Sequence, residues 1–328
     1  NLIMRKKLNN VAVLPLMNED GFAGLGPKFA LRGVQSLLAA DVLDDIRSGI
    51  MAHAQDPVEG IKIFNEEFEQ LKIAEEAKPD YIFRSLKTFA KNIRTKIPST
   101  KNIKDAKYIA LVGEMYVRRD HFSHNYLNKQ FAEKGFILKD AYLTEWLFYI
   151  DYLMKLELLE PDTSFKKKYE RIIRASYMHY AEFRIKKILQ KSGYYKYSRT
   201  DIESLLKHSS HVIPIDCKGE PGLTLGVALH ESIEKYCGIV NLGPFGCMPT
   251  RFSEAVTVPE MTIKNKIHAK KLNNSAYQLS PLFNEKMNIP FLTIETDGNV
   301  YPQAAEAKIE TFLMQAEKTH RLMKQSKD

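Results

Sequence analysis

Four short apolar runs limit most strongly what this chain can fold into. They are YIALVGE at 108–114, FILKDAYLTEW at 136–146, GIVNLGPFG at 238–246 and IPFLTIETDG at 289–298. A short run that is apolar throughout is typical of a strand buried on both faces of a parallel sheet. Segments with helical periodicity separate the runs, and strands that alternate with helices favour right-handed crossovers. We therefore predict an α/β fold with an open, mostly parallel sheet flanked by helices.

Two segments show the clearest helical periodicity. Apolar residues recur at three- and four-residue steps in 28–50, at Leu31, Val34, Leu37, Leu38, Val42 and Ile46. A second stripe in 303–323 comprises Ala305, Ile309, Phe312, Leu313 and Ala316. Both patterns predict amphipathic helices with one buried face. Further helices are expected after Pro57, at about 122–134, from Glu145 onward and over LTLGVALHESIEKY.

Length and composition favour two domains in this chain. With 328 residues, 44% of them hydrophobic, it exceeds the usual size of one compact domain. An apolar run, VAVLPL, and a glycine-rich turn, EDGFAGLG, open the first part, and the polar stretch KIPSTKNIKDAK ends it. We predict a largely helical first domain over 1–104 and an α/β domain over 105–328 with a helical insertion at 160–205.

Charge and hydropathy restrict the partners that we expect. The chain has 48 Lys and Arg against 40 Asp and Glu, a net charge of +8, but 27% charged residues is an ordinary share. The excess does not indicate nucleic acid binding. No apolar run reaches the roughly 18 residues that span a membrane, and no signal peptide is readable. We expect a cytoplasmic protein without a membrane partner, in which three cysteines form no disulfide framework.

The insertion at 165–199 is basic and rich in tyrosine, so two interpretations stay open. It resembles in composition an RNA- or phosphate-binding surface, or a lid over a nucleotide-like group. An apolar stripe within it, including Ile172 and Phe183, favours instead an exposed helical subdomain with a solvated charged face.

The unusual residues follow the predicted strands, where ligands bind in open α/β sheets. Glu114 follows the first strand, Glu145 the second, the turn from Gly243 to Pro249 the third, and Glu295 lies near the end of the fourth. Glu114 and Glu145 predict either a paired-carboxylate site or two carboxylates that bind backbone amides. For Glu220, the position before a helix favours a capping role.

Cys247 stands on the most constrained of these turns. Gly243 and Gly246 permit backbone angles closed to other residues, while Pro244 and Pro249 stiffen the loop. A thiol held in this way suits a metal ligand, although a buried structural cysteine is the common alternative. Its spacing from the other cysteines matches no zinc pattern. Cys217 is a weaker candidate ligand, and Cys237 is expected to pack in the core.

The histidines give weaker signals. His208 and His211 have a spacing that can bind metal on a helix, with exposed or capping roles as the alternative. His121 and His124 follow the first strand, beside Arg118 and Arg119, and suit either a substrate or phosphate contact or a helix start capped by Asp120 or Ser123. Motifs of kinases, dinucleotide enzymes, zinc proteases and esterases of the nucleophile-elbow type are absent from the sequence.

Five segments together resemble the C-terminal part of the large acyl-CoA dehydratase activase-related proteins, in a region similar to the D component of 2-hydroxyglutaryl-CoA dehydratase. They are YIALVGEMYVRRDHFSHNYL, LTEWLFYIDYL, GEPGLTLGVALHE, GIVNLGPFGCMPTR and IPFLTIETDGNVYPQAAEAKIETFLMQA. The resemblance implies flavodoxin-like domains, the first of them only partial here. It also implies a 4Fe-4S cluster, with Cys247 as the ligand from the second domain. In that family an ATPase activase supplies the electron, and the substrate is a 2-hydroxyacyl-CoA.

On this resemblance, we expect an electron-transfer component of a dehydratase- or reductase-type system. Cys247, with Cys217, would bind the cluster, Gly243, Pro244, Phe245 and Gly246 would form its cradle, and Glu114, Glu145 and Glu295 would line the crevice. The chain departs from the family because residues 1–210 contain no cysteine and no ATPase motif. It would then be a fragment of a larger protein, or a subunit that needs a second chain in a homo- or heterodimer. The alternative is a cluster-less module that docks an activase or a CoA-dependent enzyme.

Overall fold

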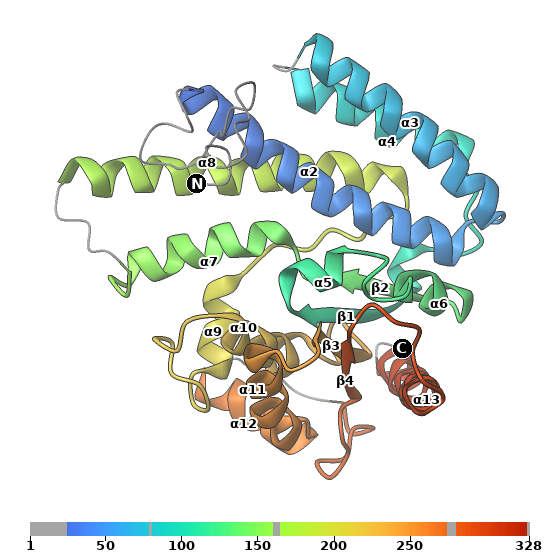
Figure 1. Cartoon of the computed structure of the whole chain (residues 1–328), viewed down its shortest axis with the longest axis vertical. Helices are drawn as coiled ribbons and strands as arrows, with labels where there is room; N and C mark the ends of the chain where they lie inside the picture. The colour runs from blue at the N-terminus through green and yellow to red at the C-terminus, as the bar shows by residue number, and fades with distance from the viewer. Residues whose placement is uncertain (1–24, 79–80, 160–164, 274–279, 327–328) are drawn as a thin grey trace, which may run out of the picture.

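The computed structural model describes residues 25–78, 81–159, 165–273 and 280–326, and the statements below concern these ranges. The predicted run VAVLPL and most of the glycine-rich turn after it lie outside them. Figure 1 shows three parts: a helical layer, a central sheet and helices packed on the sheet.

Four parallel strands form the sheet, in the order β2-β1-β3-β4. Their bounds are Lys107–Gly113 for β1, Phe136–Asp140 for β2, Gly238–Pro244 for β3 and Phe291–Thr296 for β4. The predicted α/β class, with its open parallel sheet flanked by helices, is confirmed. β1 and β3 are central, and nearly all their residues are buried, as the continuous apolar runs require.

Helices cover both faces of the sheet. On one face lie α6 (Leu127–Glu133) and α13 (Gln303–Gln325); the ring of Phe312 lies so close to Gly238 that a side chain there would collide with it. On the other face lie α10 (Glu220–Gly226) and α11 (Met248–Thr257). The remaining elements around the sheet are α5 (Met115–Arg119), α7 (Leu143–Lys155), α9 (Ile202–Ser209), the π-helical turn η4 (Val227–Glu231), the 3₁₀ turn η5 (Val258–Glu260) and α12 (Ile263–Leu272).

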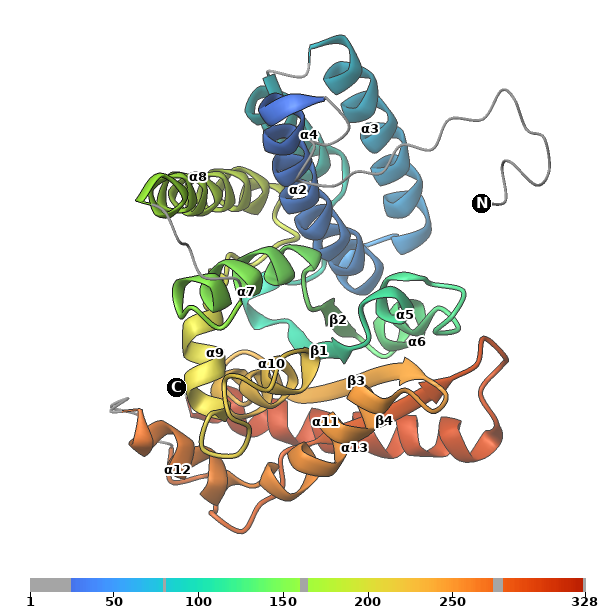
Figure 2. The ribbon, with the colours of Figure 1, turned by 60° about the vertical axis from the view of Figure 1, so that its left-hand side comes forward.

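The helical layer consists of α2 (Gly26–His53), α3 (Pro57–Ala77), α4 (Ile82–Lys96) and α8 (Phe165–Leu189). α8 packs against both α2 and α4, as Figure 2 also shows. The predicted insertion therefore packs against the N-terminal helices, while the first half of α8 has exposed side chains such as Tyr169 and Ile172. Two 3₁₀ turns, η2 (Ile103–Asp105) and η3 (Gln190–Ser192), lead toward the sheet.

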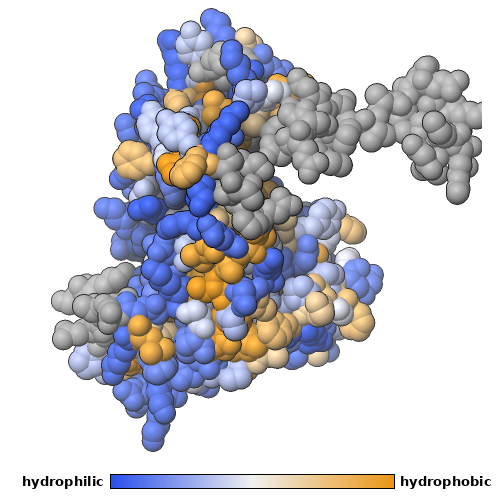
Figure 3. Space-filling model, turned by 90° about the vertical axis from the view of Figure 1, so that its left-hand side faces the viewer, coloured by the Kyte–Doolittle hydropathy of each residue, from blue (hydrophilic) through white to orange (hydrophobic). Residues whose placement is uncertain are grey.

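The predicted stripes are partly confirmed. In α13, Ile309, Phe312, Leu313 and Ala316 are buried; in α2, Leu38, Val42 and Ile46 are buried while Leu31 and Leu37 are exposed. The helix predicted at 122–134 begins only at Leu127, because Asn125 and Tyr126 adopt left-handed backbone angles. The helix predicted over LTLGVALHESIEKY ends at Glu231. α4, α11 and α12 were not predicted. Figure 3 shows apolar side chains gathered in the middle of one face, below the helical layer.

Candidate functional site

The candidate site lies at the carboxyl edge of the sheet. The strand pairing places Gly113 beside Leu242 and Gly243 beside Glu295, so the ends of β1, β3 and β4 are neighbours. Glu114, the 243–247 turn and Glu295 are thereby brought to one edge, as the sequence predicts. Glu145 comes to this edge from the first turn of α7 rather than from the end of β2.

The 243–247 turn is fixed by its backbone. The amide of Cys247 donates to the carbonyl of Pro244 at 3.1 Å, and the amide of Phe245 donates to the carbonyl of Thr296 on β4 at 2.9 Å. Gly246 has a φ of 72°, which favours glycine. At Gly243 a Cβ atom would lie 2.2 Å from Oγ1 of Thr250, so only glycine lets α11 pack this close to β3.

Cys247 is the N-cap residue of α11, and its thiol makes no capping hydrogen bond. The side chain is half-buried, whereas its neighbours Phe245 and Met248 are exposed to 79% and 78%. The backbone therefore fixes the direction of an accessible thiol within an exposed apolar surface. Tyr116, Phe122 and Val300, in segments that follow β1 and β4, are also exposed.

Glu295 connects the turn to α11. Its carboxylate accepts hydrogen bonds from the backbone amide of Gly246 at 3.3 Å and from the guanidinium of Arg251. Arg251 also binds Glu254 at 2.9 Å. Both carboxylate oxygens of Glu295 are thus engaged, and the residue acts as a brace for the turn.

Glu114 has the capping role that was the alternative to a catalytic one. Its two carboxylate oxygens accept from the amides of Tyr116 at 3.1 Å and Val117 at 2.7 Å, which begin α5. Its own amide donates to the carbonyl of Leu242 at 2.8 Å. Gly113 precedes it with a φ of 104°, and a Cβ atom there would lie 2.1 Å from that carbonyl oxygen.

Arg118 is the buried cation of this edge, and it interacts electrostatically with Glu145 and Glu220. Its Nη1 donates to the carbonyl of Gly113 at 3.1 Å, while its Nε has no partner. Burial raises the pKa of Glu145 and of Glu220, and the charge of Arg118 opposes that rise in both. Glu145 also accepts from the amide of Tyr142 at 3.3 Å. After burial, the charge of Arg118 has the largest effect on the pKa of Glu145.

A second buried cluster lies next to this edge, where α2 meets the sheet. Asp41 of α2 accepts from the amides of Leu143 and Thr144, both at 3.0 Å, and thereby caps α7 from another part of the chain. It also pairs with Arg119 at 2.6 Å. Asp140, at the end of β2, is 4% exposed, and neither of its carboxylate oxygens has a hydrogen-bond partner within the described part of the chain. Burial raises the pKa of Asp140 to about 8.

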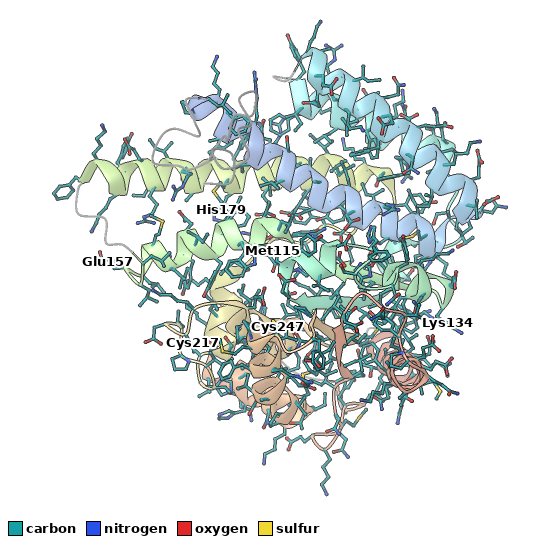
Figure 4. All side chains as sticks on the ribbon, viewed as in Figure 1. Met115, Lys134, Glu157, His179, Cys217 and Cys247 are labelled. Carbon is teal, nitrogen blue, oxygen red and sulfur yellow. The ribbon has the colours of Figure 1, made fainter. Side chains whose placement is uncertain are left out.

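The other two cysteines belong to segments other than the turn. Cys237 is buried, its Sγ lies 3.2 Å from the carbonyl of Tyr108, and burial raises its pKa to about 12, so the expected core position is confirmed. Cys217 is half-buried in the loop before α10, where it packs on Ile213, Leu225 and Leu229. Figure 4 labels Cys217 and Cys247, which belong to separate loops.

The histidines serve local structure. His124 is fully buried, and its Nδ1 accepts from the amide of Leu127 at 3.0 Å. Its Nε2 lies 3.3 Å from Nδ1 of His121, and Asp120 caps the loop through the amide of Ser123. His208 is buried in α9 with its ring centroid 4.4 Å from that of His230, and His211 lies beyond the end of that helix.

The chemistry available at the edge is therefore one accessible thiol and a set of partnered carboxylates. Among the described residues, no group of three or more His, Cys, Asp and Glu side chains is placed to hold a metal ion. In the same ranges, no helix has the length and hydropathy to cross a bilayer.

Sequence reasoning missed the roles of Arg118, Asp41 and Asp140. Arg118 and Arg119 were visible in the RRD motif after β1, but their partners lie on α2, α7 and α10. Asp140 ends an apolar run, and that position was the available signal.

In comparisons with family models, curated proteins and solved structures, no match to this chain was found.

Proposed function

We propose that the chain is an electron-transfer component that contributes the thiolate of Cys247 to a 4Fe-4S cluster shared with another polypeptide. The observation that supports this is the presentation of Cys247: a half-buried thiol, without a capping bond, on a turn fixed by Gly243 and Gly246 at the carboxyl edge of a parallel sheet. Rigid presentation of a thiolate is what a cluster ligand needs.

The residues of this chain do not fit a complete cluster. A cubane takes one thiolate for each iron, and the sequence has three cysteines, one of which, Cys237, is enclosed in the core. Cys217 is the second candidate ligand, from a separate loop. The missing ligands would have to come from an activase, from a related subunit or from outside the printed sequence.

The chain's own residues would prepare the edge for such a partner. Phe245 and Met248 flank the thiol with exposed apolar surface, which docking would cover and dry. Glu295 and Arg251 hold the turn in place on the other side. The remaining carboxylates of the crevice, Glu114 and Glu145, support backbone and Arg118 in this structure, and a contact of theirs with an acyl-CoA substrate is part of the proposal only.

The test is anaerobic co-expression with an ATP-hydrolysing activase, followed by iron and sulfide analysis and absorbance near the thiolate-to-iron band. We expect iron in the complex, and its loss in Cys247→Ser. Cys217→Ser separates a one-ligand from a two-ligand contribution. Met314→Ala is the control, because it removes an exposed methionine of α13, outside the 243–247 turn, and should leave the iron content unchanged. An iron-free complex under all these conditions would refute the cluster.

A second candidate function is supported by the apolar surface itself. Phe245, Met248 and Val300 are each about four-fifths exposed, which suits a module that docks an activase without any cluster. In that case Phe245→Asp would abolish the complex, Cys247→Ser would leave it intact, and the complex would contain no iron.

A further inference from the structure

A second site is visible at the opposite, amino edge of the sheet, where the helical layer meets it. A groove of ≈ 960 Å³ runs between the end of α4, the segment through η2, the end of α8 and the strap Tyr194–Tyr197. Volumes of this order are typical of sites for small molecules. The groove lies before the start of β1, so it is separate from the turn that carries Cys247.

The lining of this groove is strongly basic. It contains five basic side chains and one acidic one, Asp105, a net charge of +4 within a protein whose total is +8; the basic members are Arg94, Lys101, Lys104, Lys187 and Lys196. Within the described ranges, Arg94, Lys101, Lys104 and Lys187 have no carboxylate at ion-pair distance. The lining of the groove thus carries a net charge equal to half of the chain's net positive charge.

The walls of the groove are held by hydrogen bonds. The carbonyl of His53 accepts from the amide of Thr100 at 2.9 Å and from the hydroxyl of Ser99 at 3.2 Å, which ties the segment before η2 to the end of α2. The hydroxyl of Tyr194 donates to the carbonyl of Ile97 at 3.3 Å. Because both walls are fixed, the cations between them are already gathered in the absence of a ligand.

The strap Tyr194–Tyr197 also lines a separate inner cavity of ≈ 90 Å³. Its lining combines tyrosines with lysines and one acid: Asp45, Tyr108, Lys139, Tyr194, Tyr195, Lys196, Tyr197, Ser198, Lys235 and Tyr236. Two of its lysines are already paired, Lys139 with Asp45 at 2.6 Å and Lys235 with Glu231. This cavity can take a few heavy atoms of a ligand whose anionic part lies in the outer groove.

We propose that the groove binds a small phosphorylated ligand with at least two phosphate groups, of the class of a nucleoside diphosphate. The charge decides the class: a single carboxylate would neutralise a quarter of the +4 lining, whereas two phosphates carry roughly −3 to −4 near neutral pH. Arg94 and the lysines Lys101, Lys104 and Lys187 contact the phosphates, and Arg94 is suited to a bidentate contact.

The experiment is isothermal titration of the whole chain with inorganic pyrophosphate, ADP and inorganic phosphate, at about 0.15 M salt where nonspecific attraction is screened. We expect pyrophosphate and ADP to bind, and phosphate to bind at least about tenfold more weakly. If ADP binds more tightly than pyrophosphate, the inner cavity contributes to the affinity for the nucleoside. If ADP and pyrophosphate bind with equal affinity, the diphosphate is the part of the ligand that is recognised. Either result supports the proposal.

Variants locate the site. The double variant Lys101→Met and Lys104→Met should weaken pyrophosphate binding by about tenfold or more, since each removes an exposed cation without emptying the core. Lys129→Met, on α6 and equally exposed, is the matched control and should change the affinity less than about twofold. The proposal would be overturned if the double variant and Lys129→Met lost the same affinity for pyrophosphate. It would also be overturned if neither pyrophosphate nor ADP bound while a single-stranded oligonucleotide did. None of these readouts depends on iron.

Discussion

The two edges of the sheet differ in how their charges are satisfied. At the carboxyl edge, Glu114 caps a helix, Glu295 pairs with Arg251, and Asp41 pairs with Arg119. At the amino edge, cations such as Lys101 and Lys104 line a groove and have no ion-pair partner among the residues that the structure describes. Charges with internal partners support the fold, whereas gathered like charges without them add repulsion, which an external anion would remove.

The difference also separates two kinds of site. The carboxyl edge presents a thiol and exposed apolar side chains, and the carboxylates of Glu114 and Glu295 have internal partners, so it suits contact with a macromolecule that brings further ligands. The amino edge presents charge and volume, so it suits a small anion. Substitutions that remove the internal partners of the carboxyl edge should therefore lower the stability of the fold, whereas substitutions in the groove at the amino edge should change ligand binding.

The largest effect is expected at Asp41. Asp41→Ala should lower the free energy of unfolding by about 3 to 5 kcal/mol, because it uncaps α7 and leaves Arg119 with one fewer carboxylate in a buried setting. Urea unfolding followed by circular dichroism measures this. Asp44→Ala, which removes the less buried partner of Arg119, is the matched control and should cost clearly less. Equal losses would mean that capping of α7 contributes little.

A somewhat smaller loss is expected at Gly113. Gly113→Ala should lower the free energy of unfolding by at least about 2 kcal/mol, because its φ is 104° and the new Cβ would meet the carbonyl oxygen of Leu242. Gly135→Ala is the comparison: its φ is also positive, at 75°, but the nearest atom would be 3.6 Å away. If both variants lose the same amount, the close approach of β1 and β3 is not what requires glycine.

The fold was largely predictable from the sequence because its signals are local. Strands buried on both faces leave continuous apolar runs, and β3 and β4 end within two residues of the predicted turns. The helix at 122–134 failed because the backbone of Asn125 and Tyr126 turns to positive φ, which the side-chain pattern does not reveal. α8 has a charged pattern that does not indicate which helices it packs against.

The candidate site was predictable in position more than in role. The sequence located Glu114, Cys247 and Glu295 at strand ends, but it could not show that both carboxylates are engaged by backbone amides and Arg251. Asp41 and Arg119 are 78 residues apart in the chain, so their contact depends on the tertiary structure. The basic groove was missed for the same reason, because Arg94 and Lys187 come from distant segments.

Acid should destabilise the protein through histidines at both edges. Burial lowers the pKa of His53 and of His124 to about 4, against an ordinary value of 6.5. The folded state therefore resists protonation while the unfolded chain accepts it. The contribution of each neutral histidine to the free energy of unfolding is fully present above pH 6.5. It is lost as the pH falls toward 4, by about 2 kcal/mol for each histidine.

Urea titrations at pH 7 and 4.5 measure the effect. His124→Gln should reduce the difference in unfolding free energy between the two pH values, even if it lowers stability at both, because glutamine does not titrate. An unchanged difference would assign the acid sensitivity to other groups, such as His230, whose pKa burial lowers to about 3.

The smallest effect links a histidine to the basic groove. After burial, the charges of Lys101 and Lys107 are the next causes of the low pKa of His53, whereas for His124 the next cause is the charge of His121. Pyrophosphate bound beside Lys101 should therefore raise the pKa of His53 by about half a unit and leave that of His124 unchanged. Lys101→Met should raise the pKa of His53 in the absence of ligand. In this variant, pyrophosphate should cause no further rise of that pKa. Titration of the imidazole signals by NMR resolves both histidines, and parallel movement of the two would show that the edges share one electrostatic environment.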